Sequence, residues 1–315
     1  MNRLEVRIGG LRMESPIVMV SGVFGYGEVG LDYVNYGKLG AIVTKTLSLE
    51  PRKGNSQPRV WETASGMINS VGLQNPGVRD FIQDKMPAIR THGAKIIISI
   101  MGKNLNEISE VTGILMEEKD RFDAIELNLS CPNVDRDKPM VSQSPEMTGI
   151  FVETAKKLCG KVPLIAKLSP SVTDITAIAA AAEQAGADGL SMINTVRALA
   201  VDTAGMRIIE GGLSGPPIKP IGLRAVYDVY RKSRIPIIGI GGITTGRDAL
   251  EYMLAGATAV GAGSGFFSNP ALMDEIYDTL NDFLAKNGKS LADITGSLNE
   301  KEQGKGTGNS TEARV

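Results

Sequence analysis

Eight short apolar runs, separated by amphipathic segments, constrain the fold of this chain most strongly. The segments between them, such as NLNEISEVTGILMEEKD and TDITAIAAAAEQAGAD, carry apolar residues at helical spacing. The runs lie at residues 17–22, 41–46, 95–102, 124–130, 163–169, 189–195, 236–243 and 259–266. Eight alternating strand and helix units favour an α/β fold of the TIM-barrel type, a closed parallel (β/α)8 barrel, over an open doubly wound sheet.

Three features lie outside the eight units. The segment LEVRIGGLRMES alternates around Gly9-Gly10, which predicts an N-terminal β-hairpin at the floor of the barrel. Two long insertions, about residues 47–76 and 196–218, follow the second and sixth strands, and long loops of this kind usually carry function. We expect residues 1–298 to form one domain and the polar, Gly-rich residues 299–315 to be a disordered tail.

Composition excludes several classes of function. A net charge of −1 leaves no electrostatic footprint for nucleic acid, and no apolar run reaches the ~20 residues that span a membrane. The N-terminus does not resemble a signal peptide, and the two cysteines, Cys131 and Cys159, suit a reducing cytoplasm. Cys159 is expected to be a small buried filler. With His92 as the single histidine, no metal site is expected.

Polar residues gather where the predicted strands end. In a parallel barrel these carboxyl ends form one rim, where the chemistry takes place. A lone lysine at a strand end is usually just solvated, but two lysines, several asparagines and a cysteine on one rim indicate a binding or catalytic site. The rim residues are Ser21, Lys45, Thr46, Ser99, Asn128, Cys131, Asn133, Lys167, Asn194, Thr195, Gly241, Gly242, Gly263 and Ser264.

The glycine-rich turns GIGGI (239–243) and GAGSG (261–265) predict a phosphate site, since bare backbone N–H groups can surround phosphate oxygens after the last two strands of a barrel. The phosphate could belong to a substrate or to a cofactor. Lys167 lies in an otherwise apolar strand, where burying its charge costs free energy unless an anionic partner is present. A reduced flavin carries such a charge, so flavin mononucleotide (FMN) satisfies both features.

Motifs in order along the chain resemble the dihydroorotate dehydrogenases of class 1. The match runs from Ser21 to about Pro270, and its subtype resembles class 1B, which passes electrons to NAD, in GLQNPG and GGLSGPPIKP. The motifs are KTLSLEPRKGNSQPR (45–59), NSVGLQNPG (69–77), LNLSCPNV (127–134), AKLSP (166–170), NT (194–195), GGLSGPPIKP (211–220), GIGGI and GAGSG. The membrane-associated class 2 carries serine at the position of Cys131 and an N-terminal helical extension.

The resemblance implies that Cys131 is the base that takes the C5 proton of dihydroorotate while C6 delivers hydride to the flavin N5. It assigns substrate binding to Lys45, Asn69, Ser70, Val71, Gly72, Leu73, Asn128, Asn133, Asn194 and Thr195. It assigns FMN binding to Ser21, Lys45, Thr46, Ser99, Asn128, Lys167, Ile193, Gly215, Gly241, Gly242, Gly263 and Ser264. Ser99 departs from the family, which often has asparagine there, so a weaker contact is expected.

The resemblance also implies partners and a place in metabolism. It predicts a cytoplasmic enzyme of pyrimidine biosynthesis, acting as a dimer that associates with a subunit bearing FAD and a [2Fe–2S] cluster to form a heterotetramer. Three alternatives stay open from the residues: another FMN-dependent pyrimidine oxidoreductase, a non-redox phosphate-binding lyase or isomerase, and a barrel retained only for binding.

Overall fold

The eight predicted strands form a closed parallel barrel. The computed structural model describes residues 3–27, 34–89, 94–130 and 141–299. Around the barrel the strands follow the order β10-β13-β14-β3-β4-β7-β8-β9, with β9 pairing back to β10. The strands are β3 (Ile17–Met19), β4 (Ala41–Val43), β7 (Lys95–Ile100), β8 (Ala124–Asn128), β9 (Leu164–Leu168), β10 (Gly189–Met192), β13 (Ile237–Ile240) and β14 (Ala259–Ala262). The predicted fold class is therefore confirmed.

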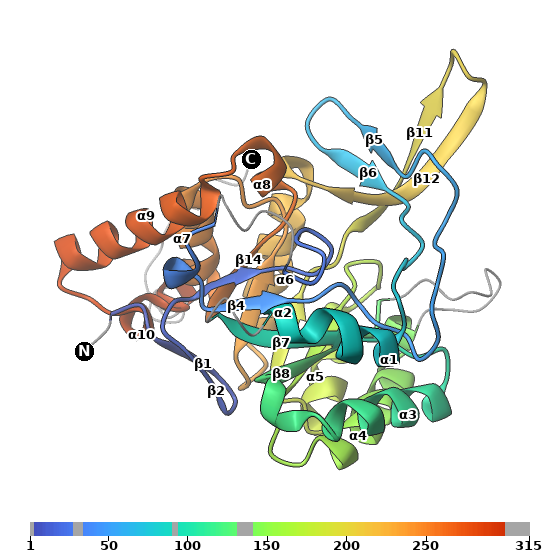
Figure 1. The fold of residues 1–315 in the computed structure, drawn as a ribbon. Coiled ribbons are helices and arrows are strands. Elements are labelled where there is room, and N and C mark those ends of the chain that lie inside the picture. The colour runs from blue at the N-terminus through green and yellow to red at the C-terminus, as the bar shows by residue number, and fades with distance from the viewer. Residues whose placement is uncertain (1–2, 28–33, 90–93, 131–140, 300–315) are drawn as a thin grey trace.

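Helices cover the outside of the barrel (Figure 1), because their apolar stripes pack against strands that are buried on both faces. Several helices begin where the sequence supplies a cap: Ser144 precedes Pro145 in α4, and Thr245 makes a capping box with Asp248 in α7. The α-helices are α1 (Val78–Asp80), α2 (Met86–Ile89), α3 (Leu105–Met116), α4 (Pro145–Cys159), α5 (Ile175–Gln184), α6 (Lys219–Tyr230), α7 (Gly246–Ala255), α8 (Gly265–Ser268), α9 (Leu272–Asn287) and α10 (Leu291–Ile294). A π-helix, Phe81–Lys85, joins α1 to α2.

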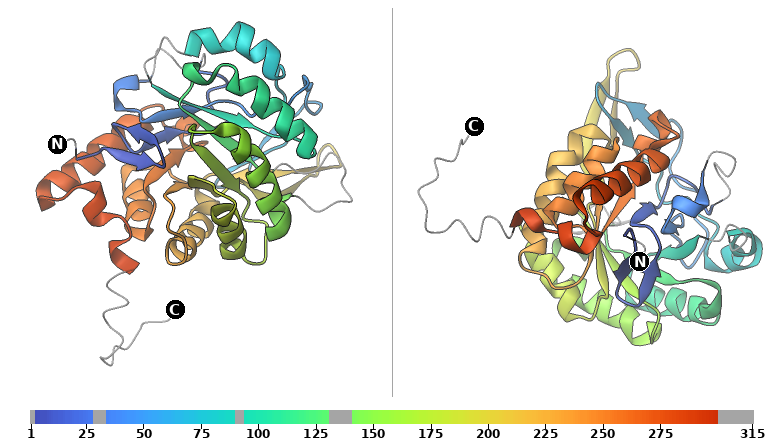
Figure 2. Two further views of the ribbon diagram at one scale, coloured as in Figure 1. Left: turned by 90° about the horizontal axis from the view of Figure 1, so that it is seen from below. Right: turned by 90° about the vertical axis from the view of Figure 1, so that its left-hand side faces the viewer.

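The predicted hairpin closes the floor of the barrel. Strands β1 (Val6–Ile8) and β2 (Leu11–Met13) pair antiparallel, and in each strand the first and last residues are buried. The hairpin lies against the amino ends of barrel strands: a Cβ on Gly189 would come within 2.5 Å of Ile8, and one on Gly10 within 3.5 Å of Pro163. Figure 2 shows this dark-blue hairpin from below. The carboxyl rim lies at the opposite end of the barrel.

The two insertions form one antiparallel sheet that the sequence did not predict. Strands β5 (Val60–Glu62) and β6 (Met67–Asn69) come from the first insertion, and β11 (Val196–Asp202) and β12 (Arg207–Ser214) from the second. They pair in the order β11-β12-β6-β5. In Figure 1 this sheet projects beyond the barrel, with the β11–β12 hairpin as its tip. The pairing of β6 with β12 therefore ties the two insertions together.

Two details differ from the predicted pattern. Between β3 and β4 the described residues hold a 3₁₀ turn, Tyr36–Lys38, rather than an α-helix. The tail was predicted to begin at Asn299, but this residue is buried and its side-chain amide donates to the carbonyl of Ala255 at 2.9 Å. The folded part therefore includes Asn299, and residues 300–315 lie outside the described part.

Cys159 is fully buried at the end of α4, as predicted, and burial raises the pKa of its thiol to about 12. Among the residues that the structure describes, no helix is long and apolar enough to cross a membrane.

Candidate active site

Polar side chains fill the barrel interior just below the carboxyl rim. The ladder pairs Ser99 of β7 with Glu126 of β8, and Lys167 of β9 with both Asn128 and Ser191. Paired residues on neighbouring strands point to the same face of a sheet, so these side chains share the barrel interior. Glu126 accepts hydrogen bonds from the hydroxyls of Ser99 (3.0 Å) and Ser191 (2.9 Å). The structure therefore adds a buried carboxylate to the predicted site.

Sequence reasoning missed Glu126, although a signal was present. It is the one charged residue in the apolar run AIELNLS, and it lies two residues before Asn128, on the same face of the strand. Glu126 is 1% exposed and Lys167 is 6% exposed. The Lys167 ammonium lies 3.7 Å from a Glu126 oxygen, so a buried ion pair lies beneath the rim.

Hydroxyl groups connect this pair to the rim. The Thr46 hydroxyl lies 3.0 Å from that of Ser99 and 3.3 Å from that of Ser21, and it accepts a hydrogen bond from the Asn128 side chain at 3.2 Å. The Asn128 carbonyl oxygen in turn accepts from the backbone N–H of Ser130. Four predicted FMN contacts, Ser21, Thr46, Ser99 and Asn128, therefore form one network. Ser99 is fully buried within it.

Lys45 is the second cation of the rim. Its Nζ would lie 3.8 Å from a Cβ built on Gly22, next to Ser21. Among the described residues it makes no ion pair and no side-chain hydrogen bond. Burial, and secondarily the charge of Lys167, lower the pKa of its ammonium below the ordinary value of 10.5. A desolvated ammonium without an acidic partner suits an anionic ligand.

We expect Lys45→Met to stabilise the ligand-free protein. Below the lowered pKa the folded protein carries a desolvated charge, and this penalty disappears as the pH rises towards 10.5, where the unfolded chain also loses the proton. Removing it should add on the order of 1 kcal/mol to the free energy of unfolding at pH 7. Urea unfolding at pH 7 and pH 10 would measure this gain, which should be smaller at pH 10.

Lys103→Met is the matched control, because that lysine is half exposed and pairs with Glu107 at the surface. A gain for Lys45→Met that equals the control, or that grows with pH, would contradict the burial of a costly charge at Lys45.

The two glycine-rich turns that are predicted to bind phosphate, GIGGI and GAGSG, follow the neighbouring strands β13 and β14. None of the backbone N–H groups of Gly242, Ile243, Gly263 and Ser264 donates to another described residue. The ladder pairs Ile240 with Gly261, so the two turns leave the barrel side by side. Four unpaired N–H donors on adjacent turns are able to bind an oxyanion.

Close packing requires glycine at one of these positions. Gly242 has a φ of +66°, and a Cβ there would lie 2.7 Å from the backbone nitrogen of Lys219 and 2.8 Å from the carbonyl oxygen of Gly215. Gly215, from the second insertion, and Gly242, from the turn after β13, are two predicted FMN contacts and are thus neighbours. A Cβ on Gly241 would lie 3.3 Å from Ile193, a third predicted contact.

A buried carboxylate holds the GIGGI turn from behind. Asp248 accepts hydrogen bonds from the backbone N–H groups of Thr244 and Thr245, and from the Lys219 ammonium at 2.6 Å. Burial would raise the pKa of Asp248, but the hydrogen bonds from Lys219 and the two threonines hold it below its usual value. The Tyr252 hydroxyl donates to the carbonyl of Gly241 at 2.7 Å. Contacts within the protein therefore hold this turn in place.

The predicted substrate residues meet where the two insertions join. Asn69 pairs with Gly212 in the β6–β12 ladder, and its side-chain amide donates to the Gly212 carbonyl at 3.3 Å. A Cβ on Gly212 would lie 2.0 Å from the Thr195 hydroxyl, so Thr195 lies directly over this glycine. Asn194 accepts from the Thr195 backbone N–H, and its own N–H donates to the carbonyl of Leu168, next to Lys167.

The loop from Ser70 to Leu73 has an unusual backbone: Gly72 and Leu73 both have positive φ, +72° and +56°. Asn75, which sequence reasoning missed, anchors this loop. Its side chain accepts from the backbone N–H groups of Ser48 and Gly77 and donates to the carbonyl of Leu73. The NPG of GLQNPG is the sequence signal for this turn.

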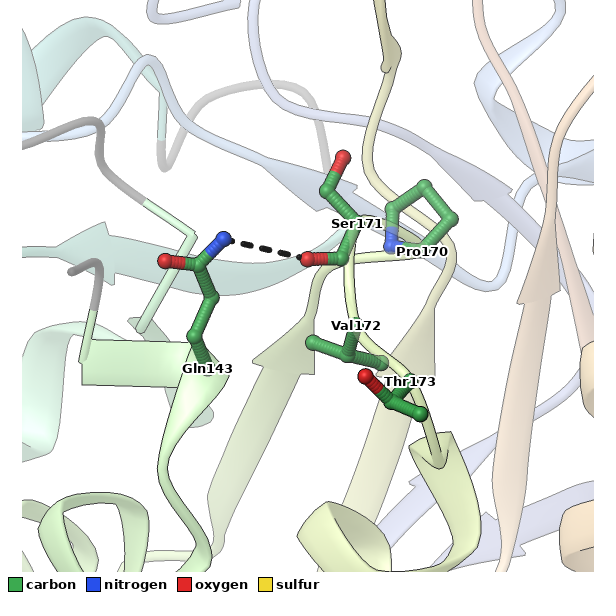
Figure 3. Close-up of a pocket in the computed structure, with 5 residues that line it drawn as sticks. All are labelled: Gln143, Pro170, Ser171, Val172 and Thr173. Atoms are coloured by element: carbon green, nitrogen blue, oxygen red, sulfur yellow. Dashed lines mark hydrogen bonds between the residues drawn. The ribbon is translucent and has the colours of Figure 1, made fainter.

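A pocket of about 440 Å³ opens at the ends of β8 and β9. It is lined by Gln143 and by residues 170–173, and Gln143 donates to the carbonyl of Ser171 at 3.2 Å. Figure 3 shows Gln143 on one segment, facing the loop that carries Pro170, Ser171, Val172 and Thr173. The pocket includes Pro170 of the AKLSP motif and extends the rim beyond the predicted residues.

Cys131 and Asn133 lie outside the described residues, so the predicted base and one predicted amide stay predictions. Among the residues that the structure describes, no group of His, Cys, Asp and Glu is arranged to hold a metal ion.

Fold and site together describe a parallel barrel whose carboxyl rim gathers two buried lysines and unpaired backbone N–H groups. The family model for dihydroorotate dehydrogenase matches residues 3–284. A protein of Caldicellulosiruptor bescii named dihydroorotate dehydrogenase B (NAD(+)), catalytic subunit, is 44% identical over 301 residues, covering 94% of this chain and 99% of that protein. A protein of Geotalea daltonii with the same name is 44% identical over 303 residues, covering 94% and 98%. The chain belongs to the dihydroorotate dehydrogenase family of oxidoreductases, which confirms the resemblance.

Proposed function

We propose that this chain oxidises (S)-dihydroorotate to orotate with FMN, as a step of pyrimidine biosynthesis. Cys131 would take the proton from C5, and bound FMN would accept the hydride of C6 at its N5. The observation that carries this proposal is the rim itself. In a chain of this family, Lys45, Lys167 and four unpaired backbone N–H groups converge on one barrel mouth, where an anionic cofactor and an anionic substrate would bind.

The described residues fit FMN. Its phosphate would lie against the N–H groups of Gly242, Ile243, Gly263 and Ser264, and Gly215 and Ile193 would line the cofactor beside them. Lys167 would face the flavin ring, together with the network of Ser21, Thr46, Ser99 and Asn128. When bound, FMN supplies the hydride acceptor, and a cation at its ring favours the reduced, anionic form.

The substrate would be held by amides and by one cation. Asn69, Asn128, Asn133 and Asn194 offer donor and acceptor pairs that suit a pyrimidine ring of alternating N–H and C=O groups. Lys45 supplies the charge for the substrate carboxylate, and Thr195 with the backbone of residues 70–73 completes the shell. The junction of the two insertions orients this group, because Asn69 and Thr195 both contact Gly212.

The electrons would then pass to NAD through a second subunit. Both relatives described above are named as catalytic subunits of an NAD(+)-linked enzyme. We infer a dimer of this chain that binds an electron-transfer subunit bearing FAD and a [2Fe–2S] cluster, as a heterotetramer in the cytoplasm.

Anaerobic titration tests the proposal. The purified protein should be yellow, should release FMN on denaturation, and should lose its flavin absorbance when dihydroorotate is added. Dihydrouracil is the control substrate, because it lacks the carboxylate that Lys45 would bind. A colourless protein, or bleaching by dihydrouracil but not by dihydroorotate, would rule out this assignment.

Lys167→Gln should make the bound flavin harder to reduce. Removing a buried cation beside developing negative charge should lower the ratio of reduced to oxidised flavin about tenfold at a fixed solution potential. Equilibration with a reference dye measures this ratio, and FMN content measures retention. An unchanged ratio together with full FMN content would remove Lys167 from the flavin site.

A further inference from the structure

Glu126 is a buried carboxylate that the reaction described above does not use. Of its two oxygens, one accepts from Ser99 and lies 3.7 Å from the Lys167 ammonium, and the other accepts from Ser191. A carboxylate that is 1% exposed is costly unless it is paired and hydrogen-bonded. Lys167 is the one cation within ion-pair distance of it in the described part of the chain. The carboxylate and the ammonium therefore hold each other in place.

The pair also sets the charge of the rim. Lys45 and Lys167 carry two positive charges, and Glu126 supplies one negative charge beneath them. These three side chains together carry one net positive charge. Without the carboxylate, the two ammonium groups would face the ligand uncompensated.

Glu126 further fixes the direction of the hydroxyl chain above it. An ionised carboxylate can only accept hydrogen bonds. Ser99 therefore donates its one hydroxyl proton to Glu126, and its oxygen must accept the hydrogen bond from Thr46. Thr46 donates its own hydroxyl proton to Ser99. Its oxygen therefore accepts hydrogen bonds from both Ser21 and Asn128. Every hydroxyl proton points down towards the carboxylate, and Ser21 is left with only lone pairs to offer a ligand.

We propose that Glu126 is a positioning residue for the flavin site: it holds the Lys167 ammonium, limits the positive charge felt by the flavin, and orients the Ser99, Thr46 and Ser21 hydroxyls so that Ser21 accepts from the ligand. This inference rests on the proposed use of FMN. It deepens that proposal, because it assigns the tuning of the flavin to a residue that would not contact the substrate.

The test compares the flavin of Glu126→Gln with that of the wild type. Glutamine keeps the volume and an oxygen for Ser99 but removes the charge, so the ratio of reduced to oxidised flavin at a fixed potential should rise about tenfold. Lys167→Gln should move this ratio in the opposite direction. The double variant Glu126→Gln/Lys167→Gln removes both charges and should lie within about threefold of the wild type.

Glu183→Gln is the matched control. Its carboxylate also accepts from a serine hydroxyl, Ser233, but on the outside of the barrel at α5. If Glu126 only stabilises the fold, Glu126→Gln should lower the melting temperature. The ratio of reduced to oxidised flavin should then equal that of this control. That outcome would overturn the proposal.

The double variant keeps the test decisive if Glu126→Gln does not fold, since a neutral pair of similar volume replaces a buried ion pair. A double variant whose flavin ratio equals that of Lys167→Gln alone would show that Glu126 exerts no effect on the flavin. A wild-type protein without flavin would instead refute the proposed function, so the two failures are distinguishable.

Discussion

Cys131→Ala is expected to leave FMN bound and to slow flavin reduction by dihydroorotate by about 10²–10⁴-fold, the usual contribution of a general base. The proposed thiolate acts on the face of the substrate opposite the flavin, so its loss should not disturb the cofactor. The residues assigned to FMN in this proposal include none of residues 131–140. Stopped-flow bleaching under anaerobic conditions measures the rate, and the absorbance of released FMN measures occupancy.

Two further variants separate the base from other roles of the thiol. Cys131→Ser should keep slow reduction that increases towards higher pH, since a hydroxyl ionises far less readily than a thiol. Cys159→Ala is the control: this thiol is buried, with a pKa raised to about 12, and should not affect the rate. Rapid bleaching of Cys131→Ala at neutral pH would end the assignment of Cys131 as the base.

The second prediction with a large expected effect concerns the rate at which the isolated chain reduces NAD. The isolated chain should bleach with dihydroorotate and reoxidise with artificial dyes or oxygen, but it should reduce NAD only poorly. An iron–sulfur cluster needs about four cysteine ligands, and this sequence has two cysteines, one of which is the proposed base. We therefore expect another polypeptide to carry the cluster in the proposed route from FMN to NAD.

Adding the electron-transfer subunit should restore NAD reduction at the rate of flavin reduction. The control combines the electron-transfer subunit with the Cys131→Ala variant of this chain. This variant should bind the partner but should not reduce NAD with dihydroorotate. If the purified chain alone reduces NAD as fast as dihydroorotate reduces its flavin, the two-subunit assignment is wrong.

Much of the site was predictable, because parallel strands bring their carboxyl ends to one rim whatever lies between them. Strand ends alone predict that Ser21, Thr46, Ser99, Asn128 and Lys167 lie on the rim, and the structure joins them in one network through Glu126. The glycines of the two phosphate turns were likewise named from composition and position. Their unpaired N–H groups are a property of the turns themselves.

The partnership of Glu126 with Lys167 could not be predicted, because it depends on the register between β8 and β9. The same holds for the sheet that joins the insertions. Asn69 and Gly212 are 143 residues apart, and short antiparallel strands in two loops carry no sequence signal for each other. Asn75 was missed for a similar reason, since its role is to tie one turn to Ser48.

The sequence by itself determined the barrel, the floor hairpin and the chemical character of the rim, because hydrophobic periodicity and strand ends are local properties of the chain. The tertiary structure alone decided which polar groups are paired. It buried Glu126 beneath Lys167, left Lys45 without an acidic partner among the described residues, and placed Asn69 and Thr195 against Gly212. The physical reason is that the energy of a charge or an amide depends on its neighbours in space, and these neighbours come from segments far apart in the chain.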